Sequence, residues 1–295
     1  MIWIIGNKGM LGTEISLLLE KNKISFTGTD IEVDITSLKA LCAFVKNKPI
    51  NWIINCAAYT AVDKAEEDAE KCRLLNTLGA ENIASCAKSK NAPLIHISTD
   101  YVFDGKGITI DGEISPYSEN DETKPIGIYG LTKRDGELAV LRNNPSSFII
   151  RTAWLYGKYG KNFADTMLQL MNERDEIKVV NDQRGSPTWT FDLASTILTI
   201  VQVMDKEKKI PFGIFNYTNE GIITWFDFAN EIYKLGCEYG RITGKCTIRP
   251  CTSAEFPAKV KRPEYSALDK SKIKEAFGIT IPTWNKSLRD YIKDN

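Results

Sequence analysis

Short apolar segments alternate with longer amphipathic ones through the first half of this 295-residue sequence, and this alternation constrains its fold more than any other feature. Apolar runs of roughly four to eight residues predict buried strands, and apolar residues at helical spacing predict helices that cover a sheet. Such alternation is typical of βαβ units around a parallel sheet. The pattern predicts strands at residues 1–6, 24–29, 51–56, 93–98 and 147–152, and helices at 10–21, 37–47, 67–90 and 127–142.

A glycine-rich loop, GNKGMLG at residues 6–12, follows the first predicted strand directly and opens the first predicted helix. Its glycines are Gly6, Gly9 and Gly12. They permit a tight turn and let a pyrophosphate approach backbone N–H groups at the positive end of a helix. In this βαβ context the loop predicts a dinucleotide-binding site.

The second predicted strand leads directly into Asp30. A carboxylate at this point of a dinucleotide fold can hydrogen-bond the adenosine ribose, which favours NADH and repels the extra phosphate of NADPH. Lys8 lies inside the glycine loop and has the opposite preference, because its ammonium group can pair with a 2′-phosphate. The sequence therefore leaves the choice between NADPH and NADH open.

The alternation loosens after Arg151, where loops marked by proline and glycine separate the predicted helices. We expect an α/β fold: a Rossmann-type doubly wound parallel sheet in residues 1–150, joined by some later segments, and a smaller mixed α/β substrate-binding lobe mainly in residues 151–295. No long flexible linker separates the two parts, so the cleft between them is the expected ligand site. The helices expected in the second part are at about 160–173, 189–204 and 224–236.

The charge balance excludes several classes of partner. The sequence has 38 Lys and Arg residues and 38 Asp and Glu residues, so no net field attracts nucleic acid or an anionic membrane. The N-terminal apolar run is too short for a signal peptide, and no later run approaches the roughly 20 residues needed to span a bilayer. We therefore expect a cytoplasmic protein with no nucleic-acid and no membrane partner.

Cysteine and histidine usage excludes most metal and thiol chemistry. The seven cysteines are odd in number and form no C-x-x-C pair, which favours reduced thiols over a disulfide framework or a zinc site. The single histidine, His96, lies in the strand-like run of residues 94–98, where we expect a hydrogen-bonded sheet residue. Neither a histidine-cluster metal site nor, without His96, a Ser-His-Asp triad can form.

Tyr129 and Lys133 are four residues apart on the helix predicted before the fifth strand, so they lie on the same helical face. A tyrosine becomes an effective acid or base near neutral pH when a cation stabilises its phenolate, and Lys133 can supply that cation and also hold a cofactor ribose. Thr99 and Asp100 follow the fourth strand, at the sheet edge where ligands bind. The Thr99 hydroxyl can polarise a carbonyl while Tyr129 delivers a proton.

Together these motifs resemble the extended short-chain dehydrogenase/reductases, and longer segments resemble the dTDP-4-dehydrorhamnose reductase family. The resemblance implies reduction of the 4-keto group of dTDP-4-dehydro-β-L-rhamnose by NADPH or NADH, with a nucleotide sugar as substrate. The longer segments spread over nearly the whole chain: NCAAYTAVDKAE at 55–66, STDYVFDG at 98–105, RTAWLYG at 151–157, NFA at 162–164, NDQRGSPT at 181–188 and KRP at 261–263.

The resemblance also implies a role for each site residue. Tyr129 is the proton donor, Lys133 its partner and ribose anchor, and Thr99 the residue that orients the carbonyl. Asp100 and Trp154 contact the sugar. The residues implied to bind the cofactor, in addition to Tyr129 and Lys133, are Gly6, Gly9, Met10, Leu11 and Gly12 at the pyrophosphate, Asp30, Asp34 and Ile35 at the adenosine end, and Ala58, Tyr59 and Thr60 at the nicotinamide side.

One departure from the family concerns a metal. The family is associated with Mg²⁺ that bridges a homodimer through glutamates. Glu14 matches the first of them, but Phe191 stands where the second is expected. Mg²⁺ and the homodimer are therefore open, with Glu14 as the only candidate ligand.

Two alternative functions also remain at this point. The same scaffold can serve a related nucleotide-linked 4-keto-6-deoxysugar, because the glycine loop and the Tyr129–Lys133 pair serve only the cofactor and the proton. A non-catalytic dinucleotide-binding regulatory subunit is the second alternative. The intact Thr99, Tyr129 and Lys133 speak against it.

Overall fold

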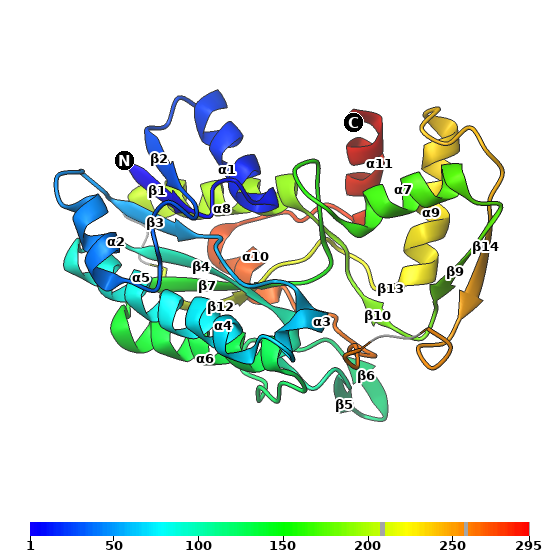
Figure 1. The fold of residues 1–295 in the computed structure, drawn as a ribbon, viewed down its shortest axis with the longest axis horizontal. Helices are drawn as coiled ribbons and strands as arrows, with labels where there is room; N and C mark the ends of the chain where they lie inside the picture. Colours follow the sequence, from blue (N-terminus) through cyan, green and yellow to red (C-terminus); the bar gives the residue numbers. More distant parts are fainter. Residues whose placement is uncertain (207–209, 257–258, 295) are drawn as a thin grey trace.

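A six-stranded parallel sheet organises the computed structural model, which describes residues 1–206, 210–256 and 259–294 (Figure 1). Its strand order is β12-β7-β4-β3-β1-β2, and every neighbouring pair is parallel. The order reverses between β1 and β3, which is where ligands bind in folds of this kind. The strands are β1 (Ile2–Ile5), β2 (Phe26–Thr29), β3 (Trp52–Asn55), β4 (Leu94–Thr99), β7 (Ser147–Thr152) and β12 (Gly213–Asn216).

The first strand shows why the sheet is buried on both faces. Ile2 and Ile4 point to one face, while Trp3 and Ile5 point to the other, and all four are buried. On the Ile4 face the core is closed by α1 (Met10–Lys21), α8 (Thr190–Asp205) and α10 (Ser271–Phe277). On the Trp3 face it is closed by α2 (Leu38–Val45), α5 (Gly79–Ser89) and α6 (Ile128–Asn143). The five strands expected in the first half of the sequence are confirmed.

Two features of the sheet and its covering helices differ from the sequence expectation. The helix expected at 67–90 is divided into α4 (Ala69–Arg73), a π-helical turn η1 (Leu74–Leu78) and α5. The sixth strand, β12, comes from far along the chain and pairs with β7. A strand of four residues that starts at a glycine carries little periodicity, so the sequence pattern does not reveal it.

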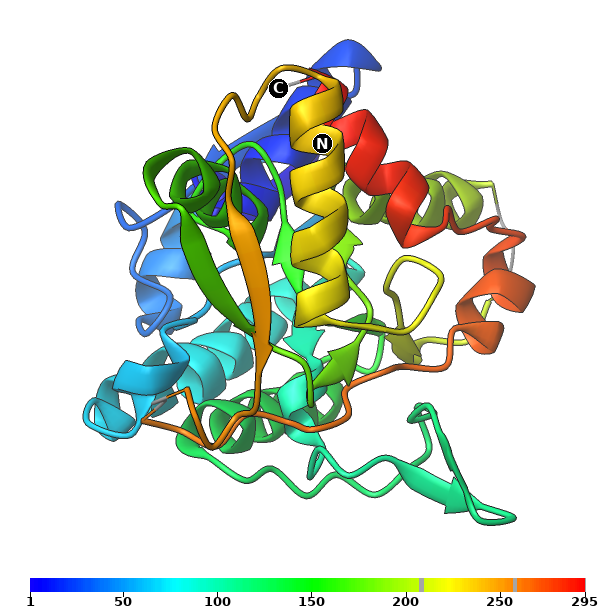
Figure 2. The same cartoon turned by 90° about the vertical axis from the view of Figure 1, so that its right-hand side faces the viewer.

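The C-terminal lobe packs three helices around a second core (Figure 2). They are α7 (Phe163–Glu173), α9 (Trp225–Glu238) and α11 (Trp284–Asp294), and a parallel pair, β9 (Glu176–Val180) and β14 (Thr247–Cys251), lies beside them. A capping box, in which Thr224 and Asp227 each bond the other's backbone, fixes the start of α9. The three helices expected at 160–173, 189–204 and 224–236 are confirmed, but the last two serve different cores: α8 the sheet and α9 the lobe.

Among the described residues, no helix is both long and apolar enough to cross a membrane. All seven cysteines are free thiols.

Short elements connect the layers of the fold. They are α3 (Val62–Ala65), η2 (Asp100–Val102), β5 (Ile108–Ile110), β6 (Glu113–Ser115), β8 (Leu155–Tyr156), β10 (Arg184–Gly185), β11 (Thr188–Trp189) and β13 (Ile223–Thr224).

Candidate active site

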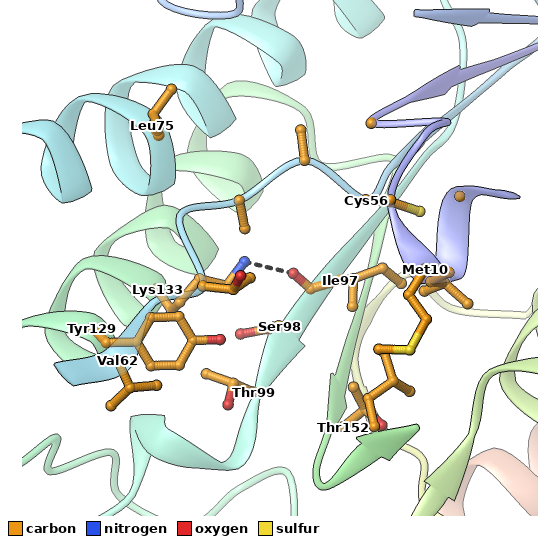
Figure 3. A pocket seen from close by; sticks show the side chains of 18 of the residues that line it. Met10, Cys56, Val62, Leu75, Ile97, Ser98, Thr99, Tyr129, Lys133 and Thr152 are labelled. Carbon is orange, nitrogen blue, oxygen red and sulfur yellow. Dashed lines mark hydrogen bonds between the residues drawn. The ribbon is translucent and has the colours of Figure 1, made fainter. Parts of the chain in front are cut away.

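A cleft of about 900 Å³ opens at the carboxyl ends of β1, β3, β4 and β7, and most of the residues expected at the site line it (Figure 3). Two expected residues do not line it: the cofactor-binding candidate Tyr59 and the metal-ligand candidate Glu14. The expected residues that line the cleft are Gly6, Gly9, Met10, Leu11, Gly12, Asp30, Asp34, Ile35, Ala58, Thr60, Thr99, Asp100, Tyr129, Lys133 and Trp154.

The glycine loop brings backbone, rather than side chains, to the floor of the cleft. Gly6 has a φ of +78°, and a Cβ there would lie 2.8 Å from the backbone nitrogen of Ala57. A Cβ at Gly12 would collide with the carbonyl oxygen of Gly6. Helix α1 starts at Met10 with no side-chain cap, so N–H groups of its first turn are left for a ligand. This geometry fits a pyrophosphate.

The end of β2 carries a charged contact that the sequence analysis missed. Glu32 accepts a hydrogen bond from the Asp30 N–H at 2.9 Å, and its other oxygen lies 3.4 Å from Lys8 Nζ. Asp34 accepts hydrogen bonds from the N–H and the hydroxyl of Thr36. The two cleft residues Lys8 and Asp30 are thus joined through a carboxylate that does not itself line the cleft.

Lys133 lies on α6 and is 2% exposed. Its Nζ donates to the Ile97 carbonyl oxygen at 2.6 Å, a contact drawn in Figure 3. Burial lowers the pKa of Lys133 to about 8, while the nearby Glu137 carboxylate acts to raise it. The lysine thus carries its charge at neutral pH inside a poorly hydrated wall, where a cation acts strongly on its neighbours.

His96 lies behind Lys133 and not in the cleft. Asn55 Oδ1 accepts the Ala57 N–H at 3.0 Å, Asn55 Nδ2 is 2.9 Å from His96 Nδ1, and Lys133 Nζ is 3.5 Å from His96 Nε2. Burial and then the Lys133 charge lower the pKa of His96 well below its ordinary value, which keeps the ring neutral. The expectation of a hydrogen-bonded sheet histidine is confirmed.

Tyr129 is on the same helix, and its hydroxyl points toward the end of β4 (Figure 3). Burial raises the pKa of Tyr129, and a hydrogen bond to Thr99 opposes that shift. Thr99 Oγ1 accepts the Tyr101 N–H at 3.2 Å and donates to Asp100 Oδ1 at 2.9 Å. Because a hydroxyl proton rotates freely, Thr99 can turn its proton from Asp100 to an oxygen bound beside Tyr129.

Asp100 is buried, and its Oδ2 has no hydrogen-bond partner. Burial raises the pKa of this carboxyl to about 7. A buried polar atom without a partner is rare and marks a place where a ligand group can bind. Asp100 therefore offers a hydrogen-bonding group to a bound hydroxyl.

Trp154 enters the cleft from an unusual backbone conformation with a φ of +48°. Its indole stacks on Trp225, at the start of α9, with ring centroids 3.6 Å apart and planes 9° apart. A Cβ at Gly185 would lie 2.7 Å from Trp154 Cε2, so only glycine leaves room for the indole. The C-terminal lobe thus fixes the orientation of Trp154.

Asn76, on the π-helical turn, is a positioning residue that the sequence analysis missed. Its Oδ1 accepts the Tyr59 N–H at 2.7 Å, and its Nδ2 donates to the Tyr59 carbonyl oxygen at 3.1 Å. The Tyr59 hydroxyl instead donates to Asp68 at 2.9 Å, which takes that side chain away from the cleft. Asn76 therefore holds the wall formed by Ala58 and Thr60. A buried asparagine in a helical pattern is the only sequence signal for it.

Other lining residues also escaped the sequence analysis, although the rule that ligands bind at strand ends could have found several. Cys56 follows β3, but burial raises its pKa to about 12, so the thiol is inert. These additional lining residues are Ile31, Val33, Cys56, Ala57, Val62, Lys71, Leu75, Ile97, Ser98, Tyr101, Thr152, Ala153, Leu155 and Lys161.

The surroundings of Glu14 do not fit a divalent cation within one chain. Burial raises the pKa of its carboxyl, and the groups that oppose this shift are the Thr190 hydroxyl and the Lys158 ammonium rather than carboxylates. In the described ranges, no three His, Cys, Asp or Glu side chains are grouped to hold a metal. Phe191, the next residue after Thr190, is 36% exposed and cannot ligate a metal.

The chain is similar over its whole length to known proteins. The family model described as the RmlD substrate binding domain matches residues 1–295. A dTDP-4-dehydrorhamnose reductase of Aggregatibacter actinomycetemcomitans is 35% identical over 97% of this chain and 96% of that protein. A dTDP-4-keto-6-deoxy-D-glucose reductase of Streptomyces niveus is 37% identical over 97% of this chain and 94% of that protein.

One solved structure adds a cofactor to the comparison. The dTDP-4-dehydrorhamnose reductase of Bacillus anthracis, in complex with NADP, is 34% identical and superposes with a TM-score of 0.90. The match covers 100% of this chain and 99% of that one. The whole architecture, and not only the glycine loop, is therefore shared with a dinucleotide-bound reductase.

Proposed function

The chain belongs to the family of the RmlD substrate binding domain, and from this premise we propose that it reduces the 4-keto group of dTDP-4-dehydro-β-L-rhamnose to give dTDP-β-L-rhamnose. It is an NAD(P)H-dependent oxidoreductase. The observation that carries the proposal is the convergence of Thr99, Tyr129 and Lys133 on one wall of a cleft whose floor is the glycine loop.

The residues at the wall divide the proton chemistry among them. Tyr129 holds its proton at neutral pH and donates it from its hydroxyl to the keto oxygen as that oxygen becomes an alcohol. The charged Lys133 stabilises the phenolate that Tyr129 then becomes. Thr99 keeps its own proton, donates a hydrogen bond from its hydroxyl to the same oxygen and so orients it.

The cofactor site fits a nicotinamide dinucleotide. The bare N-terminus of α1 meets the pyrophosphate, and the ends of β2 and β3 form the walls beside it. When bound, the reduced nicotinamide supplies the hydride. The chain's task is to hold the two reactants side by side and exclude water between them.

The sugar side is built from Asp100 and Trp154, in agreement with a hydroxyl-bearing ring. The unpartnered Asp100 oxygen accepts from, or donates to, a sugar hydroxyl, and the fixed indole provides an apolar wall. The Streptomyces niveus relative favours a second candidate, a dTDP-linked 4-keto-6-deoxyglucose. Both substrates need the same hydride and proton transfer, so the sugar product distinguishes them.

Two further proposals concern the setting of the enzyme. We infer that it works in the cytoplasm, because seven free cysteines suit a reducing compartment. We also infer that any homodimer forms without the metal bridge, since Phe191 replaces the expected ligand.

The decisive experiment follows NADPH and NADH oxidation at 340 nm with dTDP-4-dehydrorhamnose generated in situ, with and without EDTA, and identifies the sugar. We expect turnover to dTDP-L-rhamnose that EDTA does not reduce. Cofactor binding without turnover on this sugar would reject the proposed substrate, and a different reduced sugar would identify the second candidate.

The Tyr129→Phe variant tests the assigned proton donor. Loss of the hydroxyl should lower turnover by about two to four orders of magnitude, the usual scale of acid-base catalysis, while cofactor affinity stays unchanged. Tyr101→Phe is the matched control, because Tyr101 lines the same cleft and packs edge-on against Tyr129 at 5.4 Å. Near-normal turnover of Tyr129→Phe would remove the assignment.

A further inference from the structure

The lip of the cleft at the end of β2 has an excess of negative charge. Asp30, Glu32 and Asp34 contribute three carboxylates within five residues, and Lys8 forms an ion pair with one of them, Glu32. Lys8 lines the cleft, and its partner Glu32 lies just outside it; the two side chains are 65% and 50% exposed, so a ligand at the lip can compete for their ion pair. This lip is where a Rossmann-type fold places the adenosine ribose of its cofactor.

Glu32 acts on this lip in two ways. One oxygen accepts the Asp30 N–H at 2.9 Å and so fixes the loop that carries Asp30. The other oxygen lies 3.4 Å from Lys8 Nζ and so pairs with the ammonium group that could otherwise bind a phosphate. A 2′-phosphate on the ribose would have to displace Glu32 from Lys8, and it would also be repelled by the neighbouring carboxylates.

We propose that Glu32 is the specificity-determining residue for the cofactor: by occupying Lys8 and adding a carboxylate at the ribose, it directs the chain toward NADH and against NADPH. The proposal rests on the proposed function only in placing a nicotinamide dinucleotide in this cleft. It assigns Lys8 a conditional role, because that ammonium serves a 2′-phosphate only when Glu32 releases it.

The test measures binding of ADP-ribose and of its 2′-phosphate by titration calorimetry. These probes lack the nicotinamide and the sugar, so the outcome does not depend on which keto-sugar the enzyme reduces. The wild-type chain should bind ADP-ribose more tightly than the 2′-phosphate. Tighter binding of the 2′-phosphate by the wild-type chain would overturn the proposal.

Glu32→Gln removes the charge but keeps an oxygen that can accept the Asp30 N–H. It should raise affinity for the 2′-phosphate by about tenfold, the scale of one charge removed a few ångströms from a dianion in water, and leave ADP-ribose affinity unchanged. The gain should shrink as salt is raised. If only Glu32→Ala shifted the ratio, the effect would belong to the loop conformation and the proposal would be wrong.

Lys8→Met in the Glu32→Gln background completes the test. It should abolish the gain for the 2′-phosphate, because the released ammonium is then absent. Lys71→Met is the matched control, since Lys71 also lines the cleft but forms no ion pair with Glu32. An equal loss in the control would assign the effect to the overall charge of the cleft and overturn the role of Lys8. The kcat/KM ratio for NADPH over NADH should follow the same order.

Discussion

The two sides of the cleft are built by different means. The side that we propose for the cofactor, called the cofactor side, is made largely of backbone from the first half of the chain: the glycine loop, the bare start of α1 and the segment after β3. The side that we propose for the sugar, called the sugar side, depends on side chains whose positions are fixed from far along the sequence. Trp154 is held by Trp225, about seventy residues later, and by the space that Gly185 leaves.

This difference follows from what each ligand offers. A pyrophosphate and a ribose are recognised by N–H groups and a few polar atoms, which a strand-loop-helix unit supplies locally. A sugar ring needs an apolar wall in a fixed orientation, and the orientation of a single indole is fixed only when other side chains pack against it. The chain therefore concentrates its aromatic packing in the lobe that meets the sugar. Phe163 and Phe228 continue that packing behind Trp225.

Of the variants that separate the two sides, Gly12→Ala should have the largest effect, because it disrupts the cofactor side alone. The new Cβ would collide with the Gly6 carbonyl oxygen, and because the neighbouring atoms are backbone of Gly6 and Asn7, no side chain can rotate away to make room. Overpacking of this kind lowers the free energy of unfolding by about 1–3 kcal/mol, and the shifted loop should lose its cofactor affinity. Thermal unfolding and cofactor titration measure the two effects.

Gly244→Ala is the matched control for this substitution, because the nearest atom to its Cβ would be 3.7 Å away in ordinary contact. It should leave both stability and cofactor affinity close to wild type. Normal cofactor affinity in Gly12→Ala would mean that the backbone of this loop is not the binding element. The contrast between the two sides would then fail.

The sequence predicts which residues line the cleft near the glycine loop, because the signals there are local. Strand, glycine loop and helix are contiguous in residues 1–21, and hydrophobic period and glycine spacing are readable there without tertiary information. The Tyr129–Lys133 pair is also local, one helical turn apart. Its convergence with Thr99 follows from parallel strand ends meeting at one sheet edge.

The remainder could not be predicted because it depends on long-range contacts or on exceptions to helical period. Asn76 acts from a π-helical turn, and a single added residue in a turn leaves no periodic signature. Glu32 binds Lys8 across the gap between two strand ends, so neither residue predicts the other. The Trp154–Trp225 stack requires the relative placement of the two lobes, which propensity does not encode.

A smaller effect is expected from Trp225→Leu, which addresses the sugar side alone. It removes the stack that fixes Trp154 without substituting any residue that lines the cleft. An aromatic pair contributes about 0.5–1.5 kcal/mol beyond its buried area, so KM for the nucleotide sugar should rise by roughly three- to tenfold. Cofactor affinity should not change.

Phe226→Leu is the neighbouring control on α9, because Phe226 also packs on the lobe core but does not stack on Trp154. It should leave KM for the sugar close to wild type. An equal rise of KM in both variants would mean that the lobe acts through its general stability. The stack would then have no specific role on the sugar side.

The last prediction concerns pH and belongs to the cofactor side. Burial lowers the pKa of Lys133 to about 8, so the ammonium is lost as pH rises through that value. The neutral amine no longer stabilises the Tyr129 phenolate, and kcat should therefore fall above a pH of about 8, approaching tenfold per unit, while it stays level just below.

The measurement is a kcat profile from pH 6.5 to about pH 9.5 at saturating cofactor and sugar, in the wild type and in Trp225→Leu. If the two sides are independent, Trp225→Leu raises KM at every pH but leaves the descending limb where it is, because Trp225 packs in the lobe core and the groups that shift the pKa of Lys133 do not. A limb that moved with Trp225→Leu would show that the lobe controls the proton donor as well as the sugar. A profile that stays level to high pH would mean that Lys133 keeps its proton through a contact made only in the substrate complex. The bound ligands, rather than the protein groups around Tyr129, would then stabilise the phenolate.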